Sequence, residues 1–231
     1  MEALTFDLTR DTVRQMNQRL HASAVELAGH DVRILNPDGA HNIAVGLNAP
    51  MRVSVHGHAG YYAAGMNQFA SVLIEGSAST GVAENMMSGT VRVKGFASNA
   101  AGASAHGGLL VVEGDAGLRC GISLKGGDIV VGGSVGSFSG FMAQAGRMVV
   151  CGDAGDALGD SLYEARLYVR GTPKSLGADC TPKEMRDAHR SALRKLLDAA
   201  GVGGEVDVSD FRRYGSARKL YNFHIDNLGS Y

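Results

Sequence analysis

The chain has 231 residues, with 22 basic and 23 acidic side chains and a sequence pI near 6.7. This balance excludes the basic field of a nucleic-acid-binding protein and the polybasic patch of a membrane-surface protein. Glycine accounts for 33 residues, aromatic residues for 6%, and tryptophan is absent. Such a composition is typical of a turn-rich β architecture with small interior side chains.

The three cysteines, Cys120, Cys151 and Cys180, are widely spaced and form no CxxC pair. The first twenty residues carry too many charges for a signal peptide, and no apolar run has the roughly 18 residues of a membrane helix. We therefore expect reduced thiols in a cytoplasmic protein.

Residues 1–52 are expected to form an N-terminal cap. Residues 3–7 have the pattern of a short strand, and residues 8–29 follow a helical period through Val13, Met16 and Leu20. Residues 32–52 are rich in Pro, Asp, Asn and Gly, so they are expected to be an irregular lead-in coil.

Residues 53–180 repeat one pattern every nineteen residues, in seven rows without insertion or deletion. Each row begins with an apolar residue, and its third residue is always β-branched, as a strand with one buried face requires. The fifth residue is always glycine, where a corner needs either positive φ or room for a neighbouring backbone. These structural glycines are Gly57, Gly76, Gly95, Gly114, Gly133, Gly152 and Gly171.

A further column, from Ala64 to Ala178, contains only alanine and glycine, which indicates that successive rows stack over a confined interior. The sequence therefore predicts an all-β fold: a right-handed single-stranded parallel β-helix of about seven 19-residue coils, with short α-helical N- and C-terminal caps. A left-handed hexapeptide helix does not fit, because nineteen is not a multiple of six.

Residues 181–231 are expected to form a C-terminal helix and tail. Thr181-Pro182-Lys183-Glu184 has the pattern of a capping box, opening a helix that continues to Gly201. Aromatic side chains that could anchor the tail to another molecule follow: Phe211, Tyr214, Tyr221 and Phe223.

Candidate reactive groups have simpler structural explanations. His56 and His58 have a spacing that could serve a metal, but no third ligand repeats nearby, so no metal site is expected. Carboxylates near the coil corners could do acid–base work, although aspartates that cap loops are far commoner. They are Asp115, Asp153 and Asp156.

Ser139 satisfies a G-x-S-x-G pattern, but a coil corner lacks the strand-to-helix turn of a nucleophile elbow. The glycines around it follow the repeat, and no helix follows to make a phosphate loop. Cys120 and Cys151 are interpreted as core or near-core thiols. The residues therefore predict a scaffold without catalytic, cofactor-binding or metal-binding residues of its own.

The glycine columns occur together with YYAAGM at Tyr61–Met66, ENMMSG at Glu84–Gly89 and LKGGDIVVGG at Leu124–Gly133. In these features the chain resembles the C-terminal GXGXG domain of the large glutamate synthase polypeptide, its alpha subunit. With its terminal YNFHIDN at Tyr221–Asn227, it is similar to the free-standing β-helix subunits of N-methylglutamate synthase (methylamine–glutamate N-methyltransferase), a GlxC-like family.

The resemblance implies a subunit of an enzyme that converts L-glutamate and methylamine to N-methylglutamate and ammonia. It also implies that FMN, an iron–sulfur cluster and the amidotransferase nucleophile lie on partner subunits of a hetero-oligomer. The residues agree with this division. The residue directly after Met1 is not a cysteine that could act as the amidotransferase nucleophile, and the sequence has no cysteine cluster to hold iron and sulfur. Side chains should fill the bore, so any ammonia or amine path would run along the outside.

Alternatives within the scaffold class are the GXGXG-containing subunit of a formylmethanofuran dehydrogenase-type complex and the scaffold of an ordinary glutamate synthase. A metalloprotein using His56 and His58 is a second class, and an ice- or polysaccharide-binding solenoid a third. The third requires a uniform outward ladder, whereas the outward column is mixed and has an apolar middle at Val111, Val130 and Val149. That middle predicts a face covered by protein.

Candidate partner contacts are residues that carry the family resemblance without being required by the coil. They are Tyr61, Tyr62, Met66, Asn85, Met86, Tyr221 and Phe223.

Overall fold

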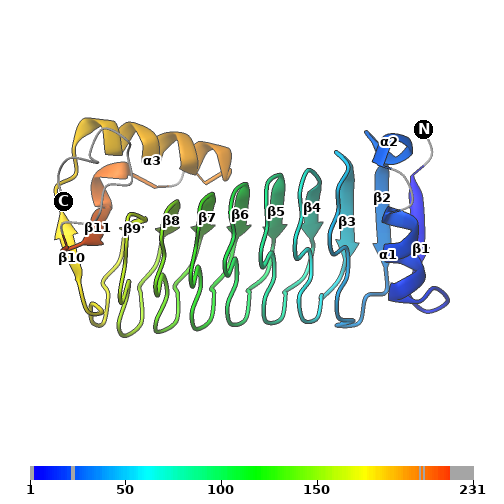
Figure 1. Cartoon of the computed structure of the whole chain (residues 1–231), viewed down its shortest axis with the longest axis horizontal. Coiled ribbons are helices and arrows are strands. Elements are labelled where there is room, and N and C mark those ends of the chain that lie inside the picture. The colour runs from blue at the N-terminus through cyan, green and yellow to red at the C-terminus, as the bar shows by residue number, and fades with distance from the viewer. Residues whose placement is uncertain (1–2, 22–23, 203, 205, 219–231) are drawn as a thin grey trace, which may run out of the picture.

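A computed structural model describes residues 3–21, 24–202, 204 and 206–218. It shows a column of stacked coils, each carrying one short strand (Figure 1). The strands of the repeat are β3 (Arg52–His56), β4 (Ser71–Ile74), β5 (Thr90–Val93), β6 (Leu109–Val112), β7 (Asp128–Val131), β8 (Arg147–Val150) and β9 (Arg166–Val169).

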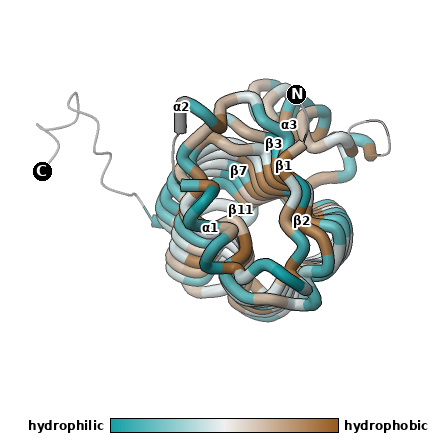
Figure 2. The backbone as a smooth tube through the Cα atoms, turned by 90° about the vertical axis from the view of Figure 1, so that its right-hand side faces the viewer, coloured by the Kyte–Doolittle hydropathy of each residue, from teal (hydrophilic) through white to brown (hydrophobic). Residues whose placement is uncertain are grey.

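These strands pair in parallel and in the register of the repeat, so that Val53 lies beside Val72 and Val72 beside Val91. A second contact between coils, an isolated bridge, joins the alanine two residues after each corner glycine to its counterpart in the next coil. Seen along the column, successive coils lie one behind another (Figure 2). The predicted parallel β-helix is confirmed.

The column begins before residue 53. Strand β1 (Leu4–Asp7) pairs in parallel with β2 (Asp31–Leu35), and β2 pairs in parallel with β3. The prediction of an irregular segment was therefore wrong for residues 32–35, which lie in β2, whereas residues 36–51 contain no strand or helix. Val32 lies beside Val53, twenty-one residues on, so this coil is two residues longer than the repeat. The turn residues of this segment form the corners of a coil, because Asn42 and Ala44 have the positive φ that is also found in later coils.

Two helices replace the single predicted N-terminal helix: α1 (Val13–His21) and α2 (Ala24–Leu27). Thr12 and Gln15 form a reciprocal cap at the start of α1, since the Gln15 N–H donates to Thr12 Oγ1 at 3.2 Å and the Thr12 N–H to Gln15 Oε1 at 3.1 Å. Met16 and Leu20 are fully buried in the main core at this end of the column. The helix thereby covers apolar surface that the first coil would otherwise expose.

The corner glycines are required by the close approach of neighbouring backbones. From Gly76 onward, each N–H donates to the carbonyl of the preceding corner glycine at 2.8–3.0 Å. A Cβ added at Gly114 would lie 2.9 Å from the carbonyl oxygen of Gly95, and one at Gly152 would lie 2.7 Å from the carbonyl carbon of Gly133. Among the seven, only Gly57 has positive φ.

The last coil is shorter than the sequence rows indicate. Leu158 bridges to Leu176, eighteen residues on rather than nineteen, so Ala178 does not continue the small-residue column. After it, β10 (Cys180–Lys183) pairs antiparallel with β11 (Arg212–Ser216), and β11 pairs antiparallel with β9. The eleven strands in the described part of the chain form one sheet.

Helix α3 (Asp187–Ala199) begins after Arg186, not at Thr181 as predicted. The segment from Thr181 to Lys183 is extended because it pairs with β11, and this tertiary pairing overrides the local capping signal. A 3₁₀ turn, η1 (Val208–Asp210), connects α3 to β11. No helix in the described ranges is both long and apolar enough to span a membrane.

A second apolar core lies outside the β-helix, between α3 and the outer face of the sheet. It contains the outward-facing Val111, Val130, Val149 and Tyr168 together with Leu193, Leu196, Leu197, Val208 and Phe211. The expectation that the valines meet protein was correct, but the covering protein is the chain's own C-terminal segment. Phe211 and Tyr214 are buried within the chain, so they are not anchors for another molecule.

Candidate partner-binding surface

Large apolar side chains are exposed on the first two coils of the repeat, outside the strands. Tyr61 is 46% exposed, Phe69 57% and Met87 48%. Phe69 and Met87 lie in neighbouring coils, since the Met87 N–H donates to the carbonyl of Asn67 at 2.8 Å. We call this surface the N-terminal apolar patch. It comprises Tyr61, Tyr62, Met66, Phe69 and Met87.

The two tyrosines are held in place by the local backbone. Their ring centroids are 5.6 Å apart with an interplanar angle of 32°. The ring of Tyr62 lies across Gly65, where an added Cβ would come within 2.5 Å of Tyr62 Cε1. Tyr62 and Met66 both have positive φ, a feature of the repeat that Phe138 and Met142 share four coils later.

Glu84 and Asn85 from the next coil border the tyrosines. Asn85 Nδ2 donates to Tyr62 Oη at 3.5 Å. A Cβ added at Gly81 would lie 2.9 Å from Glu84 Oε2, 3.6 Å from Tyr61 Cε2 and 3.7 Å from Tyr62 Cδ2. The carboxylate and both rings therefore surround the same small residue.

Burial raises the pKa of Glu84. Its carboxylate has no ion-pair partner within the part of the chain that the structure describes. A half-buried carboxylate beside two aromatic rings is suited to receive a cationic group, through both charge and the ring faces.

The structure brings four of the predicted contacts, Tyr61, Tyr62, Met66 and Asn85, together on two adjacent coils. Met86 does not join them. It is 1% exposed, and its Cε lies in the space that a Cβ at Gly108 would take, so its side chain belongs to the core. The prediction of Met86 as a contact was therefore wrong. Tyr221 and Phe223 lie outside the described residues.

A second exposed patch was missed in the sequence. Phe138 and Phe141 lie edge to face, with their ring centroids 6.2 Å apart. Met142, the residue after Phe141, is 38% exposed, and Tyr163 in the next coil is 40% exposed. We call these four residues the C-terminal apolar patch. Phe138 occupies the position of Tyr62 four repeats later, which is about 19 Å along the column. Large apolar residues at outward positions of the repeat were the available signal.

Of the histidine pair, His58 bonds to the next coil, whereas His56 bonds within its own strand. His58 Nδ1 accepts the Ser77 N–H at 3.0 Å, and His56 Nε2 lies 3.1 Å from Ser54 Oγ. No group of three or more His, Cys, Asp or Glu side chains suited to a metal occurs among the described residues.

The corner aspartates also bind the following coil. Asp115 Oδ1 accepts the Ser134 N–H and Asp153 Oδ1 accepts the Thr172 N–H, both at 2.7 Å. Asp156 binds Lys174 Nζ at 2.8 Å. Asp115 and Asp153 therefore cap loops, as predicted for corner aspartates, whereas Asp156 forms an ion pair.

Ser139 is fully buried and its hydroxyl donates to the Gly136 carbonyl at 2.8 Å, which leaves it unsuited to act as an exposed nucleophile. Cys120 is fully buried, and burial raises the pKa of its thiol to about 12. Cys151 is only half-buried, and no disulfide occurs among the described residues. Cys120 is therefore a core thiol, as predicted.

Comparison with known proteins gives one informative relative. No family model matches the chain, so the resemblance to the glutamate synthase domain stays a prediction. Protein GlxC of Rhizobium meliloti (strain 1021) is 55% identical over 227 residues, which cover 97% of this chain and 98% of the relative. The exposed tyrosines, the stacked coils and the capping helices thus occur in a chain that belongs to the GlxC family.

Proposed function

We propose that this chain is the non-catalytic scaffold subunit of a glutamate-synthase-like complex, with N-methylglutamate synthase as the leading candidate. The observation that supports the proposal best is the pair of exposed apolar patches on a continuous column. Contiguous apolar surface of this kind marks protein–protein contact more often than free surface. Two such patches about four coils apart offer two attachment points on one rigid body.

The rigidity has a clear physical source. Parallel pairing runs without interruption from β1 to β9, and the corner glycines add a second line of backbone hydrogen bonds from Gly57 to Gly171. Bending the column would break several of these bonds at once. A partner bound at each patch would therefore keep a fixed separation from the other.

The interior is filled along its height. Ile74, Val93 and Val112 are fully buried in the same core as the small residues Ala83 and Ala101. A bore packed in this way has no room for a path. Ammonia or an amine passing between partners would travel along the outer surface, shielded by the partner itself.

The catalytic groups of the proposed reaction belong to the partners in this assignment. A glutamine-amidotransferase-like subunit and an FMN- and iron–sulfur-containing subunit would convert L-glutamate and methylamine to N-methylglutamate and ammonia. Glu84 and the tyrosines would receive a cationic side chain of one partner. This assignment rests on the chain's membership of the GlxC family together with the resemblance of its coil motifs to glutamate synthase.

The test is isolation of the tagged chain from cells that make it, followed by flavin absorbance and mass spectrometry of the co-purified proteins. We expect a flavin-containing partner, with Phe69→Ser/Met87→Ser losing it at unchanged folding. Leu118→Ser, at another exposed apolar site, is the matched control and should keep it. A solitary monomer, or one that turns over substrate by itself, would contradict the proposal. Partners of another class would indicate one of the other complexes.

A further inference from the structure

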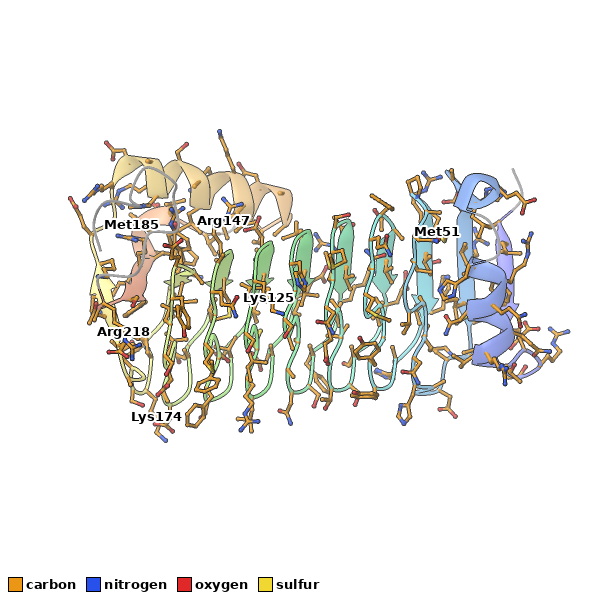
Figure 3. All side chains as sticks on the ribbon, in the orientation of Figure 1. Met51, Lys125, Arg147, Lys174, Met185 and Arg218 are labelled. Carbon is orange, nitrogen blue, oxygen red and sulfur yellow. The ribbon has the colours of Figure 1, made fainter. Side chains whose placement is uncertain are left out.

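Cationic side chains gather at the C-terminal end of the column, where β9, β11 and the first turn of α3 meet. Arg213 and Tyr168 are direct partners in the β9–β11 pair, so both side chains leave the sheet on the outer side. Arg166, two residues before Tyr168, lies on the same side and beside Arg147 of β8. Figure 3 places Arg147 and Met185 beside α3 in this region.

The hydroxyl of Tyr168 lacks a partner there. Among the described residues, Tyr168 is the largest of the fully buried side chains, and its Oη has no hydrogen-bond partner there. Burial and the carboxylate of Asp128 raise the pKa of Tyr168, while the nearby charges of Arg166, Arg213 and Arg147 act in the opposite direction. The hydroxyl thus lies within the field of these cations. A buried polar group without a partner is rare in folded proteins and calls for a bound group or water.

The positive charges around it exceed the negative ones. Arg147 is neutralised by Asp128, to which it makes two bonds of 2.6 Å, and Arg186 by Glu184 at 2.8 Å. Arg166 and Arg213 have no carboxylate partner among the described residues, although Arg213 Nε donates to the Glu184 carbonyl at 2.9 Å. The charged and titratable groups of the cluster are Arg147, Arg166, Lys183, Arg186, His189, Arg213, Asp128, Glu184 and Asp187.

The first turn of α3 adds further donors. The backbone N–H of Arg186 donates to His189 Nδ1 at 3.2 Å, so the neutral His189 ring carries its proton on Nε2. Burial and the charges of Arg213, Arg166 and Arg186 lower the pKa of His189, which is consistent with a ring that lies within the cluster. The N-terminus of the 13-residue helix also attracts negative charge.

We propose that Arg166, Tyr168, Arg213 and His189 form a binding site for a multivalent oxyanion, of which inorganic phosphate is the simplest example. Two guanidinium groups without carboxylate partners, a ring N–H and a hydroxyl present donors to one region, and guanidinium groups bind phosphate or carboxylate oxygens through paired hydrogen bonds. A bound oxygen would give the Tyr168 hydroxyl its missing partner. The side chain of Arg166 is exposed, so this donor is accessible to an anion from solvent. The site is independent of the proposed scaffold role.

The test uses the full chain and inorganic phosphate, with succinate as a second arm that separates phosphate from carboxylate recognition. Thermal unfolding is followed against anion concentration, with sodium chloride keeping the ionic strength constant. We expect a saturable rise in Tm with phosphate. Arg166→Gln and Tyr168→Phe should each weaken the apparent affinity about tenfold, the loss of one strong hydrogen bond.

Arg119→Gln, an exposed arginine on another side of the column, is the control and should bind as the parent does. Tyr168→Phe should not lower Tm in chloride alone, because its hydroxyl bonds to nothing in the described part of the chain. A phosphate response that stays the same in Arg166→Gln or Tyr168→Phe would overturn the proposal. So would a parent chain whose Tm does not respond to either anion.

Discussion

Arg92 of β5 donates from Nη2 to the main-chain carbonyl of Ala200, at 2.7 Å and across 108 residues of sequence. The same guanidinium binds Glu113 at 2.9 Å. The bond satisfies a carbonyl at the C-terminal end of α3, where helices leave such groups without partners. Helix α3 covers β6–β9, while the outer face of β2–β5 remains an open groove of about 600 Å³.

Arg92→Met should loosen the end of α3. The substitution removes the guanidinium donor, so the Ala200 carbonyl and the Glu113 carboxylate each lose a hydrogen bond. We expect the free energy of unfolding to fall by about 1–3 kcal/mol. Hydrogen exchange should quicken in the last turn of α3 and stay unchanged in β3 and β4. Arg119→Met, which removes an exposed arginine elsewhere, is the control. Equal protection of the last turn in both variants would show that the bond does not hold the helix.

Gly152→Ala should destabilise the column at a corner. The new Cβ would lie 2.5 Å from Ser134 Oγ and 2.7 and 2.8 Å from the carbonyl carbon and oxygen of Gly133, and a side-chain movement could relieve only the contact with Ser134. We expect a loss of about 1–3 kcal/mol, measured by urea unfolding. At Gly204, where no atom lies within 4 Å of an added Cβ, the same change should cost little. Similar losses at both sites would contradict the steric explanation.

Leu197→Ala tests the second apolar core. Leu197 is fully buried between α3 and the outer face of the sheet, so the cavity should cost about 2–5 kcal/mol. If the helix packs as part of one cooperative unit, unfolding stays a single transition with a lower midpoint. Two transitions, with α3 released first, would instead show that the column is stable without its cover. Exposed Leu118→Ala is the comparison.

The column itself could be predicted because its signal repeats. A β-branched third residue and a corner glycine recur in every row. Both are required because each coil stacks directly on the preceding one. The small-residue column also has two causes that act together, since Ala83 and Gly102 face the core and have positive φ. Such a fold can be predicted from the sequence because the local backbone conformation and the packing of the coils require the same residues.

The ends of the column could not be predicted in the same way, because they occur once. Thr181 to Lys183 has a helix-start pattern, yet pairing with β11 decides its conformation. Phe211 was interpreted as a contact for another molecule because the sequence does not show that α3 folds back over Val130. In the candidate surface, Tyr61 and Tyr62 were found through motif resemblance. Phe69 and Met87 were missed, although their outward positions follow from the same repeat.

Glu84→Gln should make the isolated chain more stable at neutral pH. The pKa of Glu84 is raised by burial above its model-peptide value of 4.5, so the unfolded chain releases this proton first as pH rises. The charged carboxylate therefore opposes folding above that range. Well below pH 4.5 both states are protonated and the parent and variant should be equally stable.

Urea unfolding at several pH values measures this difference, with Glu75→Gln as the control because Glu75 has Lys94 as a partner at 3.5 Å. A carboxylate that costs stability in the free chain is explained if a cation meets it in the assembled complex. Glu84→Gln should then stabilise the free chain and weaken partner binding, two effects of opposite sign from one substitution. A variant that is less stable at neutral pH, or that binds its partner as the parent does, would show that Glu84 does not contribute to partner binding in this way.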